Sequence, residues 1–153
     1  MLRSPFFRIP FLAFAIFSSV ATSQPAWFVE SDPIEGVARV EPEKISEVMF
    51  DVQTNQNASL GAEARIVDVQ PESAEFKLAF VCGSAEPQLA QPDGGTPTVL
   101  VASCSGTSDR ARLLIENTGD DDLTLTWRVT GRVMNNGSDE VPEGTTVTIT
   151  KVP

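Results

Sequence analysis

The segment Leu123 to Val133 alternates strictly between two kinds of residue. Its odd-numbered positions are apolar or glycine, and its even-numbered positions are threonine or arginine. A β-strand places successive side chains on opposite faces of its sheet, so this period of two indicates a strand with one buried face. Trp127 lies on the buried side, where we expect burial of its ring to stabilise the fold by about 2 to 3 kcal/mol. The segment is therefore predicted to be the central strand of a β-fold.

Other segments share an extended, alternating pattern, and no window of about eleven residues or more sustains the three- and four-residue spacing of a helix. They span residues 37–40, 46–52, 63–69, 76–82, 100–104, 111–115 and 145–152. Residues 27–29 are either an entry strand or a segment laid over the sandwich. With turn signals about every eight to twelve residues, the pattern predicts an all-β fold, an antiparallel β-sandwich of about seven or eight short strands.

This sandwich is immunoglobulin-like in its general architecture only. Cys82 and Cys104 lie much closer in sequence than the cysteines typical of immunoglobulin domains, and Trp127 follows the second cysteine instead of lying between the two. The sequence therefore predicts an architecture and identifies no family.

Two reversals in the chain carry hairpin signals. The Gly and Asp residues of 117–122 favour a tight turn, so the strands on either side, 110–116 and 123–133, are predicted to form a hairpin. Asn135-Asn136-Gly137 favours a turn with positive φ, which would make Val133 a sheet neighbour of the strand that begins at Thr145.

Cys82 and Cys104 both fall on the apolar side of their segments and are the only two cysteines, so we expect one disulfide between them. Simple hairpin pairing would leave their Cα atoms about 20 Å apart, whereas a disulfide tolerates about 4.4 to 6.8 Å. The bond must therefore join similarly directed strands, cross between two sheets, or follow a fold-back of Cys104 after a short flap. Closing this loop is worth roughly 3 kcal/mol in the chain-entropy model.

The first 23 residues have the parts of a secretory signal peptide: a basic start, an apolar block and then small residues, with cleavage expected after Ala21 or Ser23. The apolar block of about ten residues is short of the roughly 20 that span a bilayer. We therefore expect residues 24–153 to form a single exported domain, secreted and extracellular, or periplasmic in a bacterium. One disulfide is consistent with such an oxidising compartment.

The charge of the chain excludes two classes of partner. Removing residues 1–23 takes away Arg3 and Arg8 but no acidic residue. The remaining chain has 9 basic and 21 acidic residues, so its formal charge changes from −10 to −12. Such a surface repels phosphate backbones and anionic lipids. We expect no nucleic-acid partner and no membrane span in the mature chain; the expected partner is another extracellular protein or a surface component.

The absence of histidine removes the catalytic arrangements that depend on it, including Ser-His and Cys-His hydrolases and HExxH zinc sites. Both cysteines are assigned to the disulfide, which also removes thiolate nucleophiles and Cys-rich metal sites. A two-carboxylate glycosidase remains, but 21 acidic residues make a carboxylate pair unspecific. We therefore expect that the protein is not an enzyme and that it binds no cofactor.

Ser84 to Pro97 is the longest irregular stretch, and it lies inside the disulfide loop. It is the candidate binding loop, and its alternative reading is a tolerated surface excursion. Asn57 and Asn136 each begin an N-glycosylation acceptor pattern, which matters if the source is eukaryotic and otherwise marks polar turn residues.

Glu116, Asp120 and Asp122 are weak candidate ligands for Ca²⁺, which takes about 6 to 8 oxygen ligands. Their spacing matches no defined calcium loop, and three consecutive carboxylates in a reversing loop usually form a solvated turn. The sequence thus favours a non-catalytic binding or structural module that acts through exposed loops or sheet edges. The alternatives are a Ca²⁺-dependent adhesion module that uses the 116–122 turn and, behind it, a carboxylate-based hydrolase.

Overall fold

The computed structural model describes residues 28–56, 59–84, 86–87, 89, 98–134 and 141–153. These residues form nine strands and no helix: β1 (Phe28–Glu30), β2 (Ile34–Val40), β3 (Ile45–Thr54), β4 (Ser59–Gln70), β5 (Phe76–Cys82), β6 (Val99–Ser103), β7 (Ser108–Asn117), β8 (Leu123–Met134) and β9 (Val147–Lys151). The predicted signal peptide with its two cleavage positions, and Asn57 and Asn136, lie outside the described residues.

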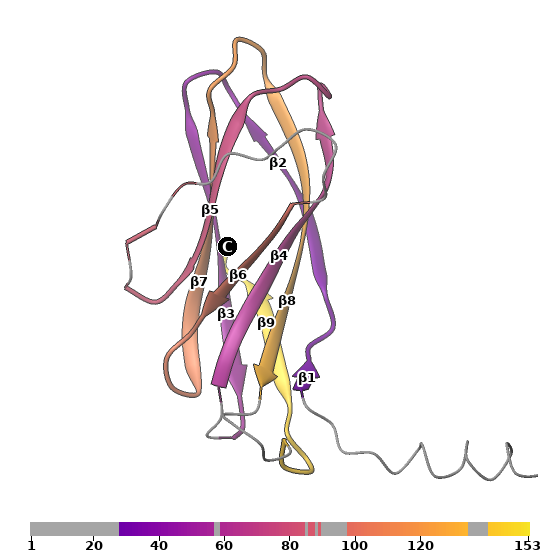
Figure 1. The fold of residues 1–153 in the computed structure, drawn as a ribbon, viewed down its shortest axis with the longest axis vertical. Helices are drawn as coiled ribbons and strands as arrows, with labels where there is room; N and C mark the ends of the chain where they lie inside the picture. The colour runs from indigo at the N-terminus through magenta and orange to yellow at the C-terminus, as the bar shows by residue number, and fades with distance from the viewer. Residues whose placement is uncertain (1–27, 57–58, 85, 88, 90–97, 135–140) are drawn as a thin grey trace, which may run out of the picture.

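The strands form two antiparallel sheets that pack face to face (Figure 1). In the five-stranded sheet β1 and β2 both pair with β8, which pairs with β4, and β4 pairs with β6. The four-stranded sheet has the order β5-β7-β3-β9. The predicted all-β sandwich is thereby confirmed, and the undecided entry segment, residues 27–29, overlaps the short strand β1 (Phe28–Glu30).

Every connection from β2 to β9 crosses from one sheet to the other. The predicted hairpin of β7 and β8 is therefore wrong, since β7 pairs with β3 and β5 in the opposite sheet from β8. The second hairpin is wrong as well, because β9 pairs with β3. The residues of a turn favour a reversal of the chain but do not determine which sheet the next strand joins. The 117–122 turn is long enough to cross the roughly 10 Å between two layers.

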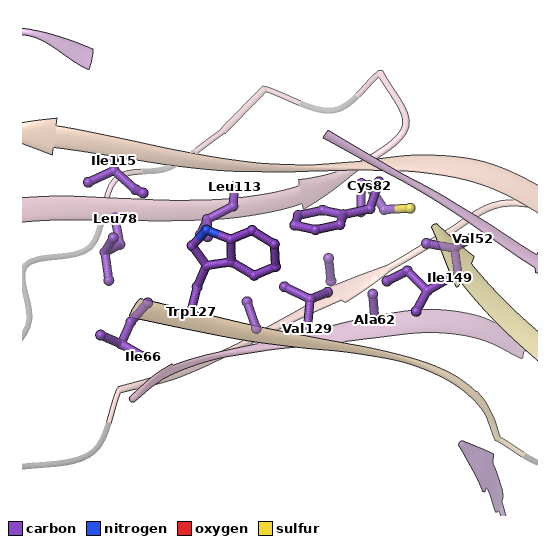
Figure 2. Packing of buried hydrophobic residues seen from close by; sticks show 14 of the residues in the cluster. Val52, Ala62, Ile66, Leu78, Cys82, Leu113, Ile115, Trp127, Val129 and Ile149 are labelled. Carbon is purple, nitrogen blue, oxygen red and sulfur yellow. The ribbon is translucent and has the colours of Figure 1, made fainter. Parts of the chain in front are cut away.

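The core lies between the sheets, and Trp127 of β8 is its largest fully buried side chain, 1% exposed. Its ring packs edge-to-face against Phe50 of β3, with the ring centroids 5.1 Å apart and the planes at 79°. Figure 2 shows Trp127 pointing from one layer toward Leu113 of the other. Gly36 of β2 lies so close that a Cβ there would overlap the indole ring. The predicted central strand thus supplies the centre of the core.

The disulfide joins Cys82, the last residue of β5, to Cys104, which follows β6, across a Cα–Cα distance of 5.0 Å. Because β5 and β6 belong to different sheets, the bond crosses between the two layers. Of the three arrangements that the sequence left open, the inter-sheet crossing is confirmed. Within the described residues, the structure has no helix of the length and apolarity needed to cross a membrane.

Candidate interaction surface

The candidate loop Ser84 to Pro97 falls mostly outside the described residues. Ser84, Glu86, Pro87 and Leu89 are described, and all four are exposed. At its base, the N–H of Gly83 donates to the carbonyl of Arg110 over 2.8 Å, next to the disulfide. The loop is therefore anchored at its start, and its role in binding stays a prediction.

The 117–122 turn is closed by the side chain of Asn117, which is 1% exposed. Its Nδ2 donates to the carbonyl oxygens of Val40 and Asp121 over 2.9 and 2.8 Å, and its Oδ1 accepts from the N–H of Gly119 over 3.0 Å. The sequence places Asn117 at the start of the predicted 117–122 turn, and that its side chain closes the turn is seen in the structure alone. Its signal was the Asn two positions before Gly119, since Asn side chains hydrogen-bond their own backbone two residues on.

The three calcium candidates occupy different places around this turn. Glu116 lies on the outer face of the four-stranded sheet, in register with Ile45 and Lys77, whereas Asp120 and Asp122 are exposed in the turn itself. Among the described residues, one group of three Cys, Asp or Glu side chains has its ligand atoms within 4.8 Å of one another, and it consists of Cys82, Cys104 and Asp109. Both sulfurs are bonded to each other, so neither is free to bind a metal as a thiolate. Calcium binding at the turn stays a prediction.

Ion pairs cover the outer face of the five-stranded sheet. Nη2 of Arg132 lies 2.7 Å from Oε2 of Glu63 and 3.7 Å from Oε1 of Glu30, and Nε of Arg128 lies 2.6 Å from Oε1 of Glu35. These pairs tie β1, β2 and β4 to β8. Exposed pairs contribute about 0 to 1 kcal/mol each, so the network favours the register of the sheet more than its stability.

Two of the hollows on the described part of the surface lie near features named above. One, of about 230 Å³, adjoins the ion pairs and is lined by Glu30, Ser31, Pro33, Glu63, Arg65, Arg128 and Thr130. The other, of about 210 Å³, adjoins the Asn117 turn. Both are smaller than the roughly 300 to 1,000 Å³ of typical ligand pockets. An extended surface is therefore a better candidate for binding than either hollow.

The strand β6 forms one edge of the five-stranded sheet, because β4 is its one neighbour in the described part of the chain. The N–H of Ile66 donates to the carbonyl of Thr98 over 3.0 Å, and the N–H of Cys104 donates to the carbonyl of Leu60 over 2.9 Å. Backbone direction alternates along a strand, so the even-numbered residues of this segment bond to β4. The N–H and C=O groups of Val99, Val101 and Ser103 consequently point away from the sheet.

The side chains of β6 add to this exposure. Val101 is 60% exposed and Val99 is 43% exposed, and the sequence of the strand, Val-Leu-Val-Ala-Ser, contains no charged residue. The other edge strands all carry charge: Glu30 in β1, Glu35 and Arg39 in β2, Lys77 in β5, and Lys151 in β9. Charged side chains on an edge prevent pairing with another chain. We name the outward backbone groups of β6 together with Val99 and Val101 the β6 edge. Among the sheet edges formed by the described residues, it is the one that carries no charged side chain.

Comparison with known proteins finds only weak structural similarity. No family model matches the sequence, and no curated protein matches it. A structure of Bacillus endospore appendages, which form disulfide-linked pili, is 12% identical with a TM-score of 0.42, covering 74% of this chain and 93% of that one. A structure of the infectious bursal disease virus Gx strain is 11% identical with a TM-score of 0.44, covering 84% of this chain and 37% of that one. The Yersinia pseudotuberculosis-derived mitogen is 10% identical with a TM-score of 0.39, covering 76% of this chain and 95% of that one. Similarities this low carry no argument about function.

Proposed function

We propose that this chain is an exported, non-catalytic binding or structural module that binds by strand addition at the β6 edge. The observation that carries the proposal is the row of outward N–H and C=O groups on Val99, Val101 and Ser103, beside two exposed valines and no charge. An extended segment laid along such a row gains main-chain hydrogen bonds, and its alternate side chains contact the valines.

Export is supported by the disulfide between the two sheets, since such bonds persist in oxidising compartments. The signal-peptide pattern of residues 1–23 supports the same location. The chain has no histidine, the side chain that most readily transfers protons near neutral pH, and this supports a non-catalytic role.

The test is selection of extended peptides from a random display library on residues 24–153. Selected peptides are then measured against two matched variants, Val101→Lys on the β6 edge and Val37→Lys on the outer face of β2. The two valines are 60% and 59% exposed, so the variants place the same charge at equally exposed positions. We expect Val101→Lys to weaken binding by at least about tenfold, equivalent to about 1.4 kcal/mol, and Val37→Lys to leave it unchanged. Peptides that bind Val101→Lys as tightly as the original chain would contradict the proposal.

A further inference from the structure

The β6 edge has a symmetric pattern that a second copy of the same chain matches. Its outward residues are Val99, Val101 and Ser103, and Val101 stands at the centre. In an antiparallel pairing about a two-fold axis at Val101, each Val101 faces the other, and each Val99 faces a Ser103. Directly opposed residues whose N–H and C=O groups point toward each other form two hydrogen bonds in an antiparallel pair. Every outward N–H and C=O of both edges is then paired.

The charges around the edge permit the same arrangement. Val101 is in register with Glu63 of β4, and Val99 is in register with Arg65. Across the two-fold axis the two Glu63 side chains are three strand spacings apart, about 14 Å, which exceeds the Debye length of about 8 Å at physiological salt. Each Glu63 also lies 2.7 Å from Arg132 of its own chain. Across the interface, the row of Arg65 continues through Val99 to Ser103 and Gly61 of the second copy, so no charge of the second copy opposes Arg65 in these strands.

From this self-complementarity we infer that two copies of the chain pair through β6 to form a continuous sheet, with the exposed valines of both copies packed side by side on its outer face. The inference rests on the proposed function and names its partner. Isologous two-fold pairing is the commonest form of homo-oligomer. One strand pair buries less than the roughly 1,200 Å² of a standard interface, so we expect a weak dimer with a Kd of about 0.1 to 1 mM, at the low end of the affinity scale.

The first experiment is sedimentation equilibrium of residues 24–153 over this concentration range, with Val101→Pro and Val37→Lys as variants. Proline at position 101 removes an N–H that points away from the sheet, so the fold loses no hydrogen bond. We expect the original chain and Val37→Lys to dimerise and Val101→Pro to stay monomeric. A monomeric original chain, or a dimer that Val101→Pro leaves unchanged, would overturn the inference.

The second experiment reads the register and does not depend on how the proline variant folds. Opposed residues with a Cα separation of about 5.5 Å lie within disulfide range. Val101→Cys is therefore expected to cross-link to itself under mild oxidation, and Val99→Cys to cross-link to Ser103→Cys but not to itself. Self-cross-linking of Val99→Cys alone would overturn this register. If the chain is monomeric and peptides still bind in a Val101-dependent way, the dimer fails while the proposed function stands.

Discussion

At the scale of single residues, the packing at the centre of the core requires a glycine at position 36. Gly36 of β2 lies against the six-membered ring of Trp127, and a Cβ at this position would overlap it. The edge-to-face contact of Trp127 with Phe50 also holds the ring in place. The indole can therefore not move away from a larger residue at position 36 without disturbing its own packing.

Gly36→Ala is expected to lower the free energy of unfolding by about 1 to 3 kcal/mol, the range for overpacking a core. The measurement is urea denaturation, repeated in the Trp127→Phe background. Phenylalanine lacks the part of the ring that Gly36 contacts, so the cost of Gly36→Ala should fall there. An equal cost in both backgrounds would show that Trp127 is not the reason for glycine at this position.

Asn117 gives a second residue-scale prediction. Asn117→Ala removes three hydrogen bonds to backbone groups at a position that is 1% exposed, and we expect a loss of about 2 to 4 kcal/mol in urea denaturation. Asn55 is the matched control, because its side chain also bonds twice to backbone, to Gly144 and Thr146, but at an exposed site. Asn55→Ala should cost about 1 kcal/mol or less, since water replaces its partners. Equal losses for the two variants would contradict this account of the turn.

At the scale of elements, the two-residue alternation in the sequence correctly predicted where the strands lie but did not predict which strands pair with each other. Leu113 of β7 and Leu125 of β8 are buried in the same way, and each pattern is satisfied whether the two strands lie side by side or face each other across the core. Alternation is a local property, whereas sheet membership depends on the whole topology. The β6 edge escaped prediction for the same reason: nothing in Val99 to Ser103 tells whether one or both sides of the strand are paired.

The turn between β7 and β8 provides the element-scale prediction. Backbone bonds to Asn117 already close this turn, and its acidic side chains are exposed. We expect millimolar Ca²⁺ to leave the melting temperature of residues 24–153 unchanged, measured by circular dichroism with Mg²⁺ as the control ion. A rise that is specific to Ca²⁺ and lost in Asp120→Asn would establish the calcium-dependent alternative.

At the scale of the whole molecule, the disulfide is a side-chain cross-link between the two layers, in addition to the chain connections that cross between them. It joins β5 of one sheet to the end of β6 in the other, and so it also holds the β6 edge in place. Cys82→Ala with Cys104→Ala is expected to lower the free energy of unfolding by roughly 3 kcal/mol, read from urea denaturation. Unchanged stability would mean that the sheets need no such link.

Amide hydrogen exchange, followed residue by residue by NMR on a dilute sample of residues 24–153, tests the β6 edge most directly. The N–H groups of Leu100 and Ala102 bond to β4 and should exchange slowly, whereas those of Val99, Val101 and Ser103 should exchange fast and become protected as the concentration rises. Equal protection of all five amides in the dilute sample would show that the edge is already paired and would contradict the account.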